Sequence, residues 1–193
     1  MSKVEGVMRK IGFPSFYIVE PIELSGGLMV AWKEEVEVQI LNWDNFYIHF
    51  RCRGQQHESI REVFGVYLDT DEAKRIDQFN QINQLIGIGS NKMTIMGDFN
   101  AITTHHEKEG GRSKSNTSIQ DFNDFINSGN LMDLGYEGEK FTWCNRQFGG
   151  NLIRERLDQV LVSRSWREEF SNAYVTHLED FGSDHRPLLL CEE

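Results

Sequence analysis

The motif GDFN at residues 97–100 places two oxygen-bearing side chains directly after the hydrophobic segment 93–96. That segment predicts a buried strand that ends at the motif. In extended backbone Asp98 and Asn100 face the same side of the strand, while Phe99 faces the core. Two such oxygens can bind a hard cation or hold a phosphate. A strand followed by an ordinary Asx turn would use the same residues, so this motif alone does not decide.

The motif GSDHRP at residues 182–187 puts a carboxylate beside an imidazole, just before the apolar segment 188–191. Asp184 can bind a metal or orient a water, and His185 can transfer a proton or stabilise negative charge near neutral pH. A surface loop with a solvated ion pair is the alternative for an isolated Asp-His pair. The dipeptide therefore needs support from the other motifs.

The motif ERLD at residues 155–158 places Asp158 within an otherwise apolar strand segment, residues 157–162. Burying a carboxylate in a strand is costly unless the carboxylate is paired. A hydrogen bond between Asp158 and His185 would remove that cost, as in other carboxylate–histidine pairs. Alternatively, Asp158 lies on the wet face of an edge strand.

Other polar residues admit more than one interpretation. The segment 105–107 (His-His-Glu) is interpreted as a solvated loop, because no further Cys/His cluster supports a transition-metal site. Arg154 and Arg156 can either touch a phosphate or pair with Glu155 at the surface. Trp143 is interpreted as a core or groove-wall aromatic, with base stacking as a secondary role.

Length, composition and charge limit the classes of protein that can carry these motifs. The 193 residues indicate a single domain over 1–193, with hydrophobic and charged contents of 39% and 26% that are ordinary for globular proteins. The formal net charge of −10 argues against a module that only grips nucleic acid, which should be basic. A metal-dependent enzyme can be acidic, because a bound cation offsets its carboxylates.

Helix and strand signals alternate along the chain without a repeat or a linker. Capping boxes predict helices that begin at Ser2 with Glu5 and at Thr117 with Gln120, and Asp71 is predicted to cap a third, long helix. The predicted strands cover residues 16–19, 28–32, 36–43, 46–53, 63–67, 93–97, 141–144, 157–162, 173–177 and 188–191, of which 28–32 is expected to be buried. Strands in hairpin order predict antiparallel or mixed sheets with helices outside.

The motifs GDFN, ERLD and SDH, in this order and each in strand context, resemble the endonuclease/exonuclease/phosphatase superfamily, which includes DNase I and the apurinic endonucleases. The resemblance covers nearly the whole chain and is closest to the endonuclease domain of plant LINE-type non-LTR retrotransposons, which carry segments similar to residues 25–33, 107–111, 133–138 and 141–145. It implies an α/β fold, a four-layer DNase I-like sandwich of two mixed β-sheets flanked by helices.

The resemblance also implies roles for individual residues. Asp98 would position or activate the attacking water, and Asn100 would hold the scissile phosphate. Tyr67 would donate a hydrogen bond to a phosphate oxygen, although residues 68–70 depart from the Gly- or Pro-containing turn that is usual after this Tyr.

The other implied roles concern the acid–imidazole pair. Asp184 would bind a metal or act as a base, His185 would stabilise charge on the phosphate, and Asp158 would orient His185. Asp184 and Asp98 are the implied metal ligands. Oxygen ligands without Cys favour Mg²⁺ or Mn²⁺ over Zn²⁺.

One departure concerns the beginning of the chain. The family normally begins with a strand carrying an Asn and a second strand ending in a metal-binding Glu, whereas Met1 stands at the helix that should follow. Neither Glu5 nor Glu20 occupies the expected strand end. We therefore expect a sandwich that lacks its first strands and a metal site that lacks one ligand.

The expected function is divalent-metal-dependent phosphodiester hydrolysis by a DNA-nicking endonuclease domain of retrotransposon origin, impaired by the missing glutamate. The alternatives are a catalytically inactive relic and a phosphatase of the same superfamily. DNA is the expected substrate, with no membrane and no obligate protein partner. The absence of a signal-like N-terminus and the three scattered cysteines predict an intracellular, non-secreted protein, nuclear if it acts on genomic DNA.

Overall fold

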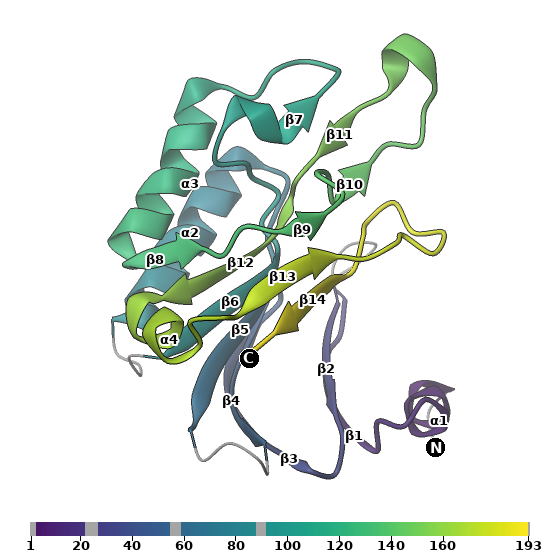
Figure 1. Ribbon diagram of the computed structural model, residues 1–193, viewed down its shortest axis with the longest axis vertical. Helices are drawn as coiled ribbons and strands as arrows, with labels where there is room; N and C mark the ends of the chain where they lie inside the picture. The colour runs from purple at the N-terminus through teal and green to yellow at the C-terminus, as the bar shows by residue number, and fades with distance from the viewer. Residues whose placement is uncertain (1–2, 22–26, 55–58, 88–91, 193) are drawn as a thin grey trace.

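A six-stranded mixed sheet forms the centre of the fold in the computed structural model, which describes residues 3–21, 27–54, 59–87 and 92–192 (Figure 1). Strands β5 and β6 pair in parallel, and the other neighbours pair antiparallel. The strands in spatial order are β3 (Val36–Asp44), β4 (Tyr47–Gly54), β5 (Arg61–Tyr67), β6 (Met93–Asp98), β12 (Asp158–Ser163) and β8 (Leu131–Asp133). This confirms the predicted mixed sheet.

Smaller sheets accompany the central one in the described ranges. Strand β1 (Ser15–Val19) pairs antiparallel with β2 (Leu28–Trp32). Strand β13 (Tyr174–His177) lies between β14 (Leu188–Cys191) and β9 (Glu137–Gly138), and β11 (Arg154–Glu155) lies between β10 (Trp143–Cys144) and β7 (Lys108–Glu109). The sheet of β10, β11 and β7 contains Trp143, which forms a β-bridge with His185.

Two long helices, α2 (Glu72–Ile86) and α3 (Asn116–Ser128), cover one face of the central sheet (Figure 1). Asp71 caps α2 as predicted, with its side chain accepting a hydrogen bond from the Lys74 amide. The predicted cap of α3 at Thr117 is wrong, because Ser115 accepts from the Ser118 amide and Thr117 lies inside the first turn. The predicted cap at Ser2 lies outside the described residues.

The shorter helices lie at the margins of the sheets. They are α1 (Lys3–Lys10), α4 (Arg164–Glu169), and the 3-10 turns η1 (His105–Glu107) and η2 (Gly149–Asn151). Helix α4 follows β12 directly, with Ser163 as its N-cap. No helix in the described part of the chain is long and apolar enough to cross a membrane.

Strand β12 separates two hydrophobic cores because its side chains alternate between the faces of the sheet. Leu161 packs with the phenylalanines of α2 and α3 on one face. Val160 and Val162 pack with Trp166, Phe170 and Val175 on the other face, against β13 and α4. The central sheet is therefore one layer of a sandwich, as the resemblance implied.

Two strands on the second side of the sandwich have an unpaired edge among the described residues. Strand β2 pairs only with β1, and β14 pairs only with β13. Strand β2 is also less buried than predicted, with Met29 44% exposed, because a two-stranded sheet covers few of its side chains. Leu189 of β14 is 46% exposed. Unpaired edges with apolar side chains are sites of association between chains.

We predict that the 193-residue chain self-associates at high protein concentration through these edges. The double substitution Met29→Lys/Leu189→Lys should shift the chain toward the monomer, since lysines on edge strands oppose strand pairing. Size-exclusion chromatography with light scattering measures this. Ile76→Lys on the exposed face of α2 is the control and should leave association unchanged. A wild-type chain that stays monomeric and melts sharply at high temperature would contradict the prediction.

Candidate active site

The strand register brings three of the predicted site residues to one end of the central sheet. Asp98, the last residue of β6, lies opposite Tyr67 of β5 and opposite Asp158 of β12. Gly97 makes this close pairing possible: its φ is 137°, and a Cβ atom there would lie 2.0 Å from the carbonyl oxygen of Val66. Any side chain at residue 97 would push β5 and β6 apart.

Asn100 adopts a left-handed conformation, with φ of 48°. Its amide N–H donates to Asp98 Oδ1 at 2.8 Å, and its side-chain Nδ2 donates to Asp98 Oδ2 at 3.1 Å and to the Leu68 carbonyl at 2.8 Å. The predicted extended backbone across 98–100 is therefore wrong. The chain turns back after Asp98, and Asn is among the residues that tolerate this conformation. Phe99 is fully buried in the core, as predicted.

His185 lies between two carboxylates. Its Nδ1 is 2.9 Å from Asp158 Oδ2, and its Nε2 is 3.9 Å from Asp98 Oδ2. A carboxylate that accepts from Nδ1–H fixes the tautomer and the orientation of the ring. The imidazole edge that carries Nε2 is thereby directed toward Asp98.

Thr142 fastens the loop that carries His185 to the strand that carries Asp158. Its Oγ1 accepts hydrogen bonds from the amides of Leu157 and Asp158, each at 3.0 Å, and its carbonyl accepts from the Arg186 amide at 2.7 Å. Thr142 is 1% exposed. Sequence reasoning did not single out this residue, although it belongs to the FTWCN segment that supported the resemblance.

Asp184 is held from the neighbouring strand β10. The Cys144 amide donates to the Asp184 carbonyl at 3.0 Å, and Trp143 Nε1 donates to Asp184 Oδ2 at 3.3 Å. Trp143 also forms a β-bridge with His185. Trp143 thus lies beside the acid–imidazole pair, which agrees with the interpretation as a wall of the site.

The carboxyl group of Asp98 is in an unfavourable place for a charge. Burial, followed by the charge of Asp158, raises the pKa of Asp98 to about 7, against the opposing effects of the Asn100 amide, His185 and Lys114. A carboxyl group with a pKa near neutral can exchange a proton at physiological pH.

The pKa of His185 is shifted in a direction that keeps the ring protonated. Burial lowers the pKa of His185, but the hydrogen bond and charge of Asp158 and the charges of Asp98 and Asp184 outweigh burial, so the net shift is upward. Burial and the charges of Asp98, Asp69 and Asp184 raise the pKa of Tyr67, whose side chain is 38% exposed. Tyr67 therefore keeps its hydroxyl proton and lies within the electrostatic reach of the acids.

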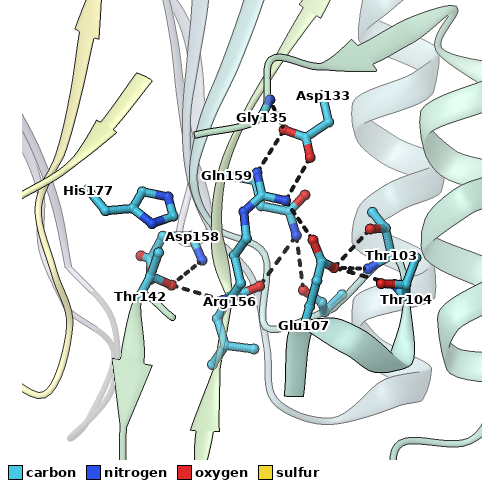
Figure 2. A network of polar contacts seen from close by, with 12 residues as sticks. Thr103, Thr104, Glu107, Asp133, Gly135, Thr142, Arg156, Asp158, Gln159 and His177 are labelled. Atoms are coloured by element: carbon cyan, nitrogen blue, oxygen red, sulfur yellow. Dashed lines mark hydrogen bonds and ion pairs between the residues drawn. The ribbon is translucent and has the colours of Figure 1, made fainter. Parts of the chain in front are cut away.

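A buried ionic network supports β12 behind the site (Figure 2). The Arg156 guanidinium donates to Glu107 Oε1 at 2.6 Å and to both carboxylate oxygens of Asp133 at 2.7 and 2.8 Å. It also lies over the Tyr136 ring, 5.0 Å from the centroid. Arg156 is 2% exposed. The interpretation of Arg156 as a phosphate contact or a surface pair is wrong, because its buried guanidinium is already bound to Glu107 and Asp133.

Glu107 is likewise part of this network. Its carboxylate accepts from the Thr103 amide and hydroxyl as well as from Arg156 (Figure 2). Interpreting segment 105–107 as a solvated loop is correct for the exposed His105 and His106 but wrong for the buried Glu107. Glu107 thereby links the loop that follows Asn100 to Arg156, which precedes Asp158 by two residues.

The donor atoms at the site match a hard divalent cation in kind. Asp98 and Asp184 offer carboxylate oxygens, and the Asn100 amide oxygen is the atom left over once its Nδ2 donates to Leu68 and Asp98. Oxygen donors are those preferred by Mg²⁺. Within the described ranges, however, no group of three His, Cys, Asp or Glu side chains is close enough to hold a metal ion. Asp98, Asp184 and Asn100 are the residues that would hold such a cation.

The sequence and the fold both lead to one family. The profile of the Endonuclease/Exonuclease/phosphatase family matches residues 6–185, and the chain therefore belongs to this family. The predicted superfamily is confirmed. No curated protein was found to match the chain.

Several solved structures share the fold. The endonuclease domain of TRAS1, a telomere-specific non-LTR retrotransposon, has a TM-score of 0.73 at 15% identity, over 98% of this chain and 90% of that one. The 3′ phosphatase NExo from Neisseria, bound to a product DNA hairpin, has a TM-score of 0.67 at 14% identity, over 100% and 85%. Sphingomyelinase C from Streptomyces griseocarneus has a TM-score of 0.57 at 15% identity, over 98% and 77%. These similarities confirm the predicted fold class.

We predict that Asp98→Asn stabilises the metal-free protein at alkaline pH. The pKa of Asp98 is about 7 in the folded chain and has its ordinary, lower value in the unfolded chain. At a pH between these two pKa values, the carboxyl group is protonated when the chain is folded and ionised when it is unfolded. The contribution of Asp98 to stability is therefore most favourable at low pH and is lost as pH rises toward about 7. Asn mimics the protonated form, and the full shift corresponds to at most about 4 kcal/mol.

Thermal melts of wild type and Asp98→Asn in EDTA, at about pH 5 and about pH 8, test this. The advantage of Asp98→Asn should be larger at the higher pH. An equal difference at both values, or a larger one in acid, would show that Asp98 is not held in its protonated form.

The hydrogen bond between Asp158 and His185 leads to a prediction about the pKa of His185. Asp158→Asn removes the partner that most raises the pKa of His185, so that pKa should fall. An NMR titration of the ring proton measures it. His49 is the control: its pKa is lowered by burial, with further effects of Glu62 and Arg51, and should be the same in both proteins. A His185 pKa unaffected by the substitution would mean that the pair does not form in solution.

Proposed function

We propose that this chain is a phosphodiesterase domain that nicks DNA and depends on a divalent cation. The observation that carries the proposal is the placement of His185 between Asp158 and Asp98, at the ends of adjacent strands. An imidazole with a raised pKa beside a carboxyl group with a pKa near 7 provides an acid and a base in one pocket. Family membership supplies the reaction class.

We assign the following parts to these residues. Asp98 accepts a proton from the attacking water, and Asn100 keeps Asp98 in place through its backbone and side-chain hydrogen bonds. His185 donates its Nε2–H to a phosphate oxygen as negative charge develops there, while Asp158 orients the ring. Tyr67 donates its hydroxyl proton to another phosphate oxygen, because it lies opposite Asp98 in the register.

Asp98 and Asp184 are the proposed holders of Mg²⁺ or Mn²⁺. A bound divalent cation would neutralise part of the charge on the phosphate and lower the pKa of a water. The charges of Asp98, Asp69 and Asp184 all act on Tyr67. Without a cation these carboxylates would repel a phosphate, which supports a bound cation at this place. With an incomplete set of donors in the described residues, we propose that the 193-residue chain holds the cation weakly and nicks slowly.

DNA is the preferred substrate in this proposal. The retrotransposon-like segments of the sequence and the fold shared with a retrotransposon endonuclease domain support it. A phosphatase that acts on a smaller phosphate ester, or a relic without activity, are the competing functions. The shared fold with a sphingomyelinase and a 3′ phosphatase keeps the first of these open.

We predict weak nicking of supercoiled plasmid by the 193-residue chain in Mg²⁺, and loss of it in Asp184→Ala. Loss of one preorganised charged group commonly lowers rates by on the order of 100-fold or more. His106→Ala changes an exposed residue outside the site and is the matched control.

The substrate panel separates the competing functions. Phosphate release from small monoesters without nicking would favour a phosphatase, and activity on neither substrate would favour a relic. Strong nicking by the 193-residue chain, abolished in Asp184→Ala, would refute the proposed weak cation binding.

A further inference from the structure

Phe181 exposes 81% of its surface on the turn that joins β13 to β14, three residues before Asp184. Phenylalanine is among the side chains most often buried, and exposing a whole ring to water is unfavourable. No part of the proposed chemistry so far uses this ring. Phe181 is therefore an exposed aromatic side chain on the same loop as the acid–imidazole pair.

The backbone at Phe181 is also unfavourable. The Ser183 amide donates to the Asp180 carbonyl at 2.8 Å, which closes a four-residue turn with φ of 45° at Phe181 and 94° at Gly182. Positive φ at both central positions is the geometry of a type I′ turn, which favours Asn-Gly. Gly182 suits its position, but a side chain as bulky as Phe rarely adopts positive φ. Asn at residue 181 would suit the turn better, because Asn is polar and adopts positive φ more readily than Phe.

Hydrogen bonds fix the backbone of the turn to the loop that carries Asp184 and His185. The Gly182 amide donates to Asp180 Oδ1 at 3.1 Å, and the His185 amide donates to Ser183 Oγ at 3.1 Å. The Arg146 Nη2 donates to the Ser183 carbonyl from the neighbouring hairpin. Arg146 therefore brings a positive charge to the same turn. Strain of this kind is often retained where a residue has a function.

We propose that Phe181 stacks on a nucleobase of the bound DNA strand, next to the phosphate held at Asp184 and His185. This rests on the proposed DNA substrate. Base stacking on an exposed aromatic ring tolerates any sequence, and Arg146 can neutralise a neighbouring backbone phosphate. A lipid surface fits less well, because a single exposed ring buries too little apolar area for stable membrane binding.

The test uses Phe181→Asn in Ca²⁺, a hard divalent cation that can neutralise the acids of the site, and gel electrophoresis checks that the labelled strand stays uncut during the binding measurement. Fluorescence anisotropy with labelled oligothymidylate should give a dissociation constant roughly 5- to 100-fold higher than for wild type. The melting temperature should rise by about 2–4 °C, because Asn relieves the turn. Phe181→Trp should keep wild-type affinity. Met132→Thr, which also removes an exposed apolar side chain, is the control and should bind like wild type.

A strand of tetrahydrofuran residues, with the same phosphates and no bases, isolates the stacking contact. Wild type should bind oligothymidylate more tightly than this base-free strand, and Phe181→Asn should bind both alike. Equal binding of oligothymidylate by wild type and Phe181→Asn would overturn the proposal. So would a loss of affinity in Phe181→Asn that is confined to phosphatidylcholine vesicles.

These readouts are independent of the proposed chemistry. If Phe181→Asn weakens oligothymidylate binding but the wild-type chain never nicks DNA, the stacking contact stands and the proposed nicking fails. If the chain nicks plasmid and binding is unaffected by Phe181→Asn, the nicking stands and the stacking contact fails.

Discussion

The buried carboxyl group of Asp98, with Asp158 opposite it on the adjacent strand, is the constraint on which the candidate site depends. The strand register places the two residues directly opposite each other, and Asp98 is only 7% exposed. Burial and the charge of Asp158 both raise the cost of charging Asp98. His185 answers both problems, because it pairs with Asp158 and lies within 3.9 Å of Asp98. The rest of the fold holds the His185 ring between these two carboxyl groups.

The support for this arrangement comes from residues far apart in the chain. Thr142 joins the loop of His185 to the strand of Asp158, and Arg156 joins that strand to the loop that follows Asn100 through Glu107. A buried ion network resists movement, because moving one member leaves another charge unpaired. The polar network in Figure 2 therefore limits how far the two halves of the site can separate.

Features that depend on local spacing could be predicted from the sequence, and those that depend on distant partners could not. The cap at Asp71, the strand that leads into GDFN and the pairing of Asp158 with His185 follow from neighbouring residues or from the cost of an unpaired carboxylate. Arg156 could not be placed, because its partners Asp133 and Glu107 lie 23 and 49 residues away. Asn100 shows a third case: the motif identified the residue, but the left-handed backbone that directs it to Asp98 depends on the turn after β6.

Several unfavourable features of this chain are concentrated at one end of the sheet. Asp98 resists ionisation, Asn100 is held at positive φ, and Phe181 is both exposed and in a left-handed turn. Each would be easier to accommodate as a different residue if stability alone mattered, because Asn at 98, Gly at 100 and Asn at 181 fit the same backbone with less conflict. Elsewhere the local preferences and the fold agree, as at the Asp71 and Ser115 caps. Conflict of this kind around the candidate site is what a binding or catalytic surface produces, since its groups are arranged for a substrate rather than for the folded chain alone.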